Sequence, residues 1–115
     1  MATREVSEDE YESFLRENEY VVVLFHAPWD GGGTLIRPRF EKAAEALGGR
    51  VHFGEVNVDE ATFAAKSIPI LNVPTVAYFK DGQLIAALVG ATQDVAARTQ
   101  AVLDGKRIGR NDGWN

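Results

Sequence analysis

The residues best suited to chemistry gather in one short stretch, where His26 is followed by Asp30 and by three glycines, Gly31 to Gly33. A histidine and a carboxylate four residues apart can perform acid–base catalysis or supply half of a metal site. Glu55 and Asp59 are the further carboxylates that could complete such a site. The simpler interpretation makes Asp30 a helix N-cap and His26 a packed or hydrogen-bonded histidine. We therefore predict no catalytic residue and no metal site.

The three glycines offer a second chemistry, because free backbone N–H groups at a helix N-terminus can bind an anion. The carboxylate of Asp30 opposes this, since it would occupy the positive end of the helix dipole and repel a phosphate. The glycines are contiguous and no Lys-Ser or Lys-Thr pair follows them, so no nucleotide-binding loop is matched. We expect no cofactor.

A strand, a turn and a helix are predicted to position this stretch. Residues 21–27 are apolar and rich in valine without helical spacing, which is typical of a strand covered on both faces. Asp30 then caps a helix that ends at Gly48 and Gly49. The apolar residues that recur at helical spacing along it are Phe40, Ala43, Ala44 and Leu47.

Before and after this stretch the pattern alternates between helix and strand. Ser7 and Glu10 match a capping box, which predicts a first helix reaching about Asn18. Residues 51–58 read as a second buried strand. We expect Asp59 to cap a short helix that Pro69 ends.

The last third of the chain predicts a hairpin and a helix. Residues 75–79 and 84–89 are apolar runs on either side of Asp81 and Gly82, a strong hairpin signal. Thr92 is expected to cap a final helix that Gly105 ends.

The size and net charge of the chain indicate a single domain and disfavour nucleic acid as a partner. The chain has 115 residues, enough for one domain, which we place at 1–105 with a polar tail at 106–115. A formal net charge of −5 disfavours nucleic acid as a partner. No apolar run approaches the roughly 18 residues of a membrane span, so we expect no membrane partner and a cytoplasmic location.

The motifs resemble the thioredoxin family in order and spacing, from about Ser7 to Asp104. Trp29 matches the tryptophan before that family's active-site cysteines, and Pro38 the proline of the following helix. Residues 73–75 resemble the loop with the cis-proline, and Gly90 the final glycine. The resemblance implies an α/β three-layer fold, with a central mixed sheet of four to five strands and helices on both faces.

The same alignment implies that the redox machinery is missing. Asp30 stands where the family has its nucleophilic cysteine, and Gly33 where it has the resolving cysteine. Leu24 replaces the buried acid that handles protons, and Glu55 replaces a lysine beneath the site. With no cysteine in the chain, thiol catalysis is excluded, and the resemblance implies a redox-inactive member.

The resemblance further implies a shallow groove that holds an extended protein or peptide segment through backbone hydrogen bonds. The groove residues expected from it are Trp29, Asp30, Gly31, Gly32, Gly33, Val73, Pro74 and Gly90. The resulting hypothesis is a non-catalytic protein-binding module of bacterial type, such as an adaptor, assembly factor or chaperone, present as a monomer or weak homo-oligomer. The alternatives are a structural or oligomerisation domain with a vestigial groove, and an enzyme of non-thiol chemistry at the turn.

Overall fold

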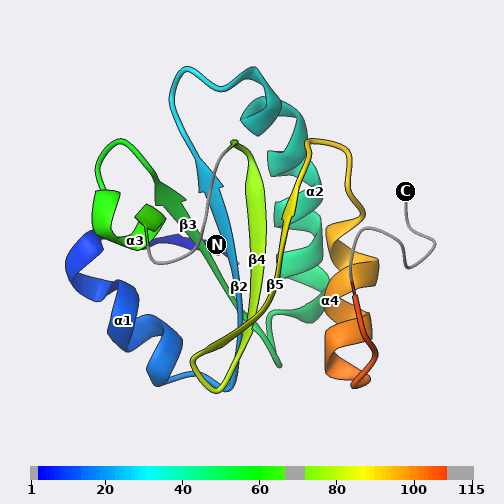
Figure 1. The fold of residues 1–115 in the computed structure, drawn as a ribbon. Helices are drawn as coiled ribbons and strands as arrows, with labels where there is room; N and C mark the ends of the chain where they lie inside the picture. The colour runs from blue at the N-terminus through cyan, green and yellow to red at the C-terminus, as the bar shows by residue number, and fades with distance from the viewer. Residues whose placement is uncertain (1–2, 67–71, 109–115) are drawn as a thin grey trace.

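The computed structural model describes residues 3–66 and 72–108. Strands and helices alternate along the chain and enclose one five-stranded sheet (Figure 1). The strands are β1 (Thr3–Glu5), β2 (Tyr20–His26), β3 (His52–Asn57), β4 (Thr75–Lys80) and β5 (Gln83–Val89). The helices are α1 (Glu8–Arg16), α2 (Gly31–Leu47), α3 (Thr62–Lys66) and α4 (Val95–Leu103).

The sheet has the strand order β1-β3-β2-β4-β5. β3 runs parallel to both β1 and β2, whereas β4 runs antiparallel to β2 and to β5. The mixed sheet of the predicted fold class is therefore confirmed. β2 is central and almost wholly buried, as its unbroken apolar run predicts.

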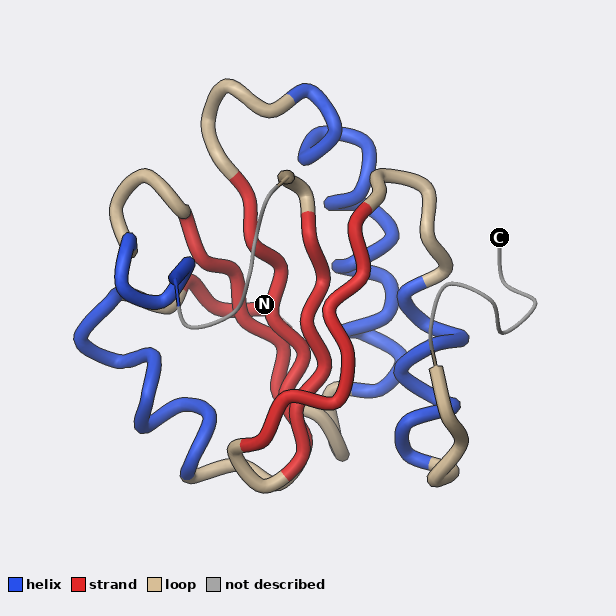
Figure 2. Tube along the Cα trace, in the orientation of Figure 1, coloured by secondary structure: helices blue, strands red, loops and turns tan. Residues whose placement is uncertain are grey.

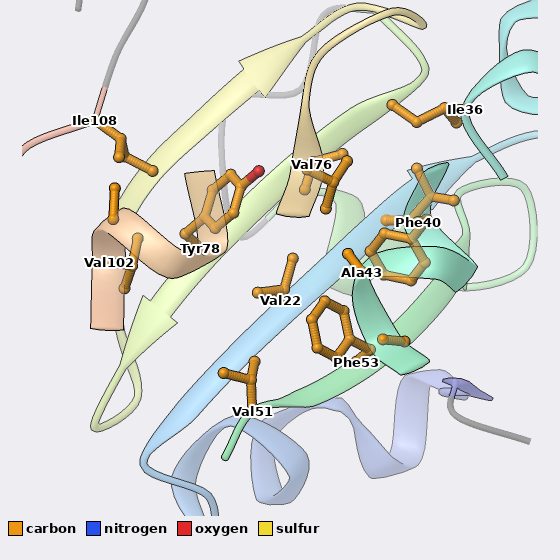
Figure 3. Packing of buried hydrophobic residues seen from close by; sticks show 14 residues of the cluster. Val22, Ile36, Phe40, Ala43, Val51, Phe53, Val76, Tyr78, Val102 and Ile108 are labelled. Carbon is orange, nitrogen blue, oxygen red and sulfur yellow. The ribbon is translucent and has the colours of Figure 1, made fainter. Parts of the chain in front are cut away.

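Each face of the sheet carries its own hydrophobic core. On one face, α2 and α4 cover a cluster that includes Phe40, Phe53 and Tyr78 (Figure 3). On the other, α1 and α3 cover a cluster that includes Phe14 and Phe25. The two layers of helices lie on opposite sides of the sheet (Figure 1), so the predicted three-layer architecture is confirmed.

The first predicted helix begins where the sequence indicates. Ser7 is the N-cap of α1, and its backbone N–H donates to Oε1 of Glu10 across 3.2 Å. The strand before it, β1, is not predicted by the sequence. β1 pairs with β3 through the register of Thr3 with Phe53, a contact that links residues fifty positions apart.

Two predicted helix caps are wrong. α4 is capped by Asp94, whose carboxylate accepts a hydrogen bond of 3.0 Å from the N–H of Ala97, and not by Thr92. α3 begins at Thr62, three residues beyond Asp59, because the chain first makes a turn. Pro69, predicted to end that helix, lies outside the described residues.

Ile108 belongs to the body of the domain, although it lies past the boundary predicted at residue 105. Its side chain is buried and packs in the cluster that contains Val102 and Tyr78 (Figure 3). The chain turns back after α4 through Gly105, which adopts a φ of 74° and so the left-handed conformation that glycine favours.

Among the helices in the described part of the chain, none is both long and apolar enough to cross a membrane.

Candidate functional site

Three separate segments of the predicted groove meet at one end of the sheet. In the sheet register, Phe25 of β2 lies beside Thr75 of β4, which in turn lies beside Val89 of β5. The turn after β2, the residues before β4 and the residues after β5 therefore share that end (Figure 2). Trp29, Pro74 and Gly90 belong to these three segments.

The indole of Trp29 is the most exposed large apolar side chain of the described residues, at 70% of its surface. It is nonetheless held, because its Nε1–H donates a hydrogen bond of 3.0 Å to Oδ2 of Asp59. The N–H of Asp59 in turn donates to Oδ1 of Asn57 across 2.9 Å. Asp59 is thus a positioning residue for Trp29, a role that the sequence does not indicate.

A backbone hydrogen bond closes the turn between β2 and α2. The N–H of Asp30 donates to the carbonyl oxygen of Ala27 across 3.1 Å, and α2 starts directly afterwards at Gly31. Asp30 therefore occupies the position predicted for the N-cap, whereas the capping hydrogen bond itself stays a prediction. A Cβ added to Gly31 would meet no atom within 4 Å, so packing does not require a glycine there.

The second and third groove segments are joined by a backbone hydrogen bond. The peptide bond between Val73 and Pro74 is cis, and the N–H of Gly90 donates to the carbonyl oxygen of Pro74 across 3.1 Å. Gly90 has a φ of 138°, a conformation that L-residues with a side chain rarely adopt. A glycine is therefore required at the end of β5.

Gln93 supports this corner of the site, although sequence reasoning passed over it. Its buried side-chain amide donates hydrogen bonds of 2.9 Å to the carbonyl oxygens of both Leu88 and Gly90. Its Oε1 accepts from Arg98 across 3.2 Å. A glutamine three residues after a glycine matches no motif, so only its burial and its hydrogen bonds in the structure identify the role.

Beneath the turn lies a polar cluster built from β2, β3 and α2. Arg37 Nη2 lies 3.0 Å from Nδ1 of His26, and Arg37 Nε lies 3.2 Å from Oε1 of Glu55. Oε2 of Glu55 also accepts a 3.2 Å hydrogen bond from the hydroxyl of Thr3. Glu55, which the resemblance places where the family has a lysine, is thus bonded to both Arg37 and Thr3.

The electrostatics of this cluster keep His26 neutral at pH 7. Burial lowers the pKa of His26 below its ordinary value, and the positive charge of Arg37 lowers it further. The neutral ring accepts a hydrogen bond from the guanidinium, so the 3.9 Å approach of Nε2 to Glu55 is not an ion pair at that pH.

The hypothesis of half a metal site finds no support in these contacts. The described residues contain no group of three His, Asp or Glu side chains that could hold a metal ion. The contacts of His26 run to Arg37 and Glu55, which suit a structural ring better than a general base, because the guanidinium competes for its lone pair.

The family profile described as Thioredoxin matches residues 2–101. The chain belongs to the thioredoxin family.

Individual relatives in that family cover most of the domain. A thioredoxin of Malassezia sympodialis is 37% identical over 86 residues, which span 74% of this chain and 82% of the relative. The chloroplastic M-type thioredoxin of Spinacia oleracea is 34% identical over 89 residues, 76% of this chain. The chain covers 49% of that relative, about half of its length.

Solved structures give the same result for the fold. The crystal structure of the Malassezia sympodialis thioredoxin, described as a member of a pan-allergen family, superposes with a TM-score of 0.77 at 31% sequence identity. The match covers 92% of this chain and 94% of that one.

Among members of the thioredoxin family, this chain is a cysteine-less one. Asp30 and Gly33 stand at the positions that the resemblance assigns to the two thiols. The chain is therefore a thioredoxin-family domain, and its lack of cysteine is consistent with a non-redox role.

Proposed function

We propose that this domain is a non-catalytic protein-binding module that holds an extended segment of a partner at the turn end of its sheet. The observation that carries the proposal is the indole of Trp29, which is 70% exposed and yet fixed in place by Asp59. A large apolar side chain that is both exposed and fixed is typical of a contact residue. The neighbouring Val73, Pro74 and Gly90 supply backbone at the same end of the sheet.

Loss of thiol chemistry supports binding over redox turnover. Thiol–disulfide exchange begins with attack by a thiolate, and the sequence has no cysteine to supply one. A carboxylate at position 30 keeps a negative charge at the start of α2 but cannot exchange with a disulfide. We therefore propose that the domain is not an oxidoreductase, and that its partner is a protein or peptide.

The location of the domain and the partners that it lacks are further parts of this proposal. We place it in the cytoplasm as a bacterial-type module, although a relative in the family is named as chloroplastic. We expect no nucleic acid and no membrane among its partners.

The test is affinity capture from a lysate of the source organism, with wild-type protein compared with Trp29→Ala. The matched control is Ile85→Ala, because Ile85 is also apolar and 44% exposed but lies at the hairpin end of β5, away from the turn. A partner that is lost with Trp29→Ala and retained with Ile85→Ala is the expected result. A partner retained by both variants would contradict the groove and favour a structural domain.

A further inference from the structure

The loops at the two ends of the sheet differ in charge. β2 and β3 end side by side, with His26 opposite Asn57, and the loops before β4 and after β5 lie at the same end (Figure 2). The described residues of these four loops are 27–30, 58–61, 72–74 and 90–94, and their charged side chains are those of Asp30, Asp59, Glu60 and Asp94. All of these are negative. The loops at the opposite end carry both signs, with Glu19 and Arg50 among them.

The helices next to these loops do not reverse the negative charge. Arg37, the first basic residue of α2, lies 3.2 Å from Oε1 of Glu55 and is paired with it. Arg98 of α4 is buried, and Lys66 is the last residue of α3, at the end of the helix that lies farther along the chain from Asp59. A segment bound at the turn end therefore meets a negative surface, which attracts basic groups.

Trp29 and Asp59 form a pair at this surface. Oδ2 of Asp59 accepts the indole N–H across 3.0 Å, so the carboxylate lies at the edge of the ring. In the described part of the chain, the second oxygen, Oδ1, accepts no hydrogen bond and meets no basic side chain. The indole itself is 70% exposed. An open aromatic face and a carboxylate oxygen thus lie side by side.

The guanidinium group of arginine matches this pair better than other side chains do. It is planar and can stack on the face of an indole, whose negative π surface attracts the cation. Its N–H groups can at the same time donate to a carboxylate oxygen beside the ring. The ammonium of lysine offers the charge without the flat surface.

We propose, on the basis of the binding function proposed above, that the partner segment carries an arginine whose guanidinium stacks on Trp29 and donates to Oδ1 of Asp59. The backbone on either side of the arginine then extends toward Val73 and Gly90. The partner is in this way a basic protein segment, held by its charge as well as by its backbone.

Charge complementarity favours this occupant over the others. An acidic segment, or a second copy of this chain with its formal net charge of −5, would bring like charges together. A purely apolar segment could cover the indole, but it would remove the carboxylate of Asp59 from water without supplying a partner, which costs free energy. A guanidinium covers the ring and pairs with the carboxylate together.

The test uses three synthetic peptides that differ at one residue. Their sequence is acetyl-Ser-Val-Ala-Xaa-Ala-Val-Ser-amide, where Xaa is arginine, citrulline or glutamate. Citrulline keeps the planar end group of arginine without its charge. Each peptide is titrated into the ¹⁵N-labelled full chain, and the indole N–H of Trp29 reports binding. We expect the arginine peptide to bind at least about fivefold more tightly than the citrulline peptide, and the glutamate peptide to bind most weakly.

Two matched variants locate the charge that selects arginine. Asp59→Asn removes the charge of the carboxylate but keeps an oxygen that can accept the indole N–H. Asp81→Asn is the control, because Asp81 is also exposed but lies in the hairpin turn at the opposite end of the sheet. Asp59→Asn should reduce the preference for arginine over citrulline by about twofold to fivefold, and Asp81→Asn should leave it unchanged. An unchanged preference in Asp59→Asn would overturn the proposal.

The peptide titrations also distinguish this proposal from the binding function on which it rests. Equal binding of the arginine and citrulline peptides, with shifts at Trp29, would overturn the choice of arginine and still support a peptide groove. An indole that does not shift with about 5 mM arginine peptide would overturn the proposal too. Affinity capture with Trp29→Ala would then decide separately whether the groove binds a protein.

Discussion

Arg37 bridges His26 and Glu55, with Nη2 lying 3.0 Å from Nδ1 of the ring and Nε lying 3.2 Å from the carboxylate. The bridge ties α2 to the last residue of β2 and to Glu55 within β3, next to the turn that carries Trp29. It requires a neutral ring, because a protonated imidazole has no lone pair with which to accept from a guanidinium.

Acidification should therefore destabilise the fold through His26. Its folded pKa is lowered by burial and by Arg37, so between that value and about 6.5 the unfolded chain binds a proton that the folded chain does not. Stability contributed by neutral His26 is present above about pH 6.5 and is lost as the pH falls below it. Urea unfolding at pH 7.5 and 5.5 should show a larger loss for wild type than for His26→Gln, which cannot titrate. An equal loss in both proteins would contradict this assignment.

Gly54 of β3 leaves room for the core beneath α1. A Cβ at this position would lie 2.8 Å from Cε2 of Phe14 and 2.8 Å from Cγ2 of Val6. Gly54→Ala should therefore cost about 1–3 kcal/mol of unfolding free energy through overpacking. Gly49→Ala is the matched control, because a Cβ there meets no atom within 4 Å. Urea titrations in which the two variants have the same midpoint would show that the packing at Gly54 is misassigned.

Asp30→Ala should lower stability by about 1 kcal/mol, as the loss of a helix N-cap does, and Asp30→Asn should lower it less. Thermal melts of the two variants beside wild type measure the difference. The cap assignment fails if neither substitution changes the melt, and a simultaneous loss of partner binding would then make Asp30 a binding residue.

The double variant Asp30→Cys, Gly33→Cys should oxidise to an intramolecular disulfide, because the two positions stand one helical turn apart at the start of α2. The thiol at position 30 should have a pKa below about 8.5, lowered by the helix N-terminus. Turnover should stay poor, since Leu24 cannot relay a proton. Mass spectrometry and the pH dependence of alkylation measure both properties, and a reduced, unbridged product in air would contradict the predicted geometry.

The sequence predicts most of the elements, because its strongest signals are local, whereas the three-layer arrangement is implied by the resemblance to the thioredoxin family. The buried run of β2, the capping box at Ser7 and the Asp81-Gly82 hairpin each specify an element without reference to distant residues. β1 carries no such signal, since Thr3–Glu5 is three residues long and is fixed only by its pairing with β3.

The sequence does not reveal contacts that depend on a distant residue or on the path of the backbone. Aspartate is a residue type that often caps helices. The carboxylate of Asp59 instead accepts a hydrogen bond from Trp29, thirty residues earlier. Thr92 and Asp94 are both acceptable caps, and only the backbone path decides for Asp94, whose carboxylate meets the N–H of Ala97. Gln93 bonds to backbone carbonyls, which no residue pattern reveals.

Binding at the turn end of the sheet is tested most directly by NMR of the ¹⁵N-labelled chain, titrated with a synthetic segment of a captured partner. The account predicts that the indole N–H of Trp29, assigned by its absence in Trp29→Phe, and the amides of Val73 and Gly90 shift together during the titration. The amide of Gly82, at the opposite end of β5, should not move. Shifts centred on Gly82, with the Trp29 indole unchanged, would contradict a binding groove at this site.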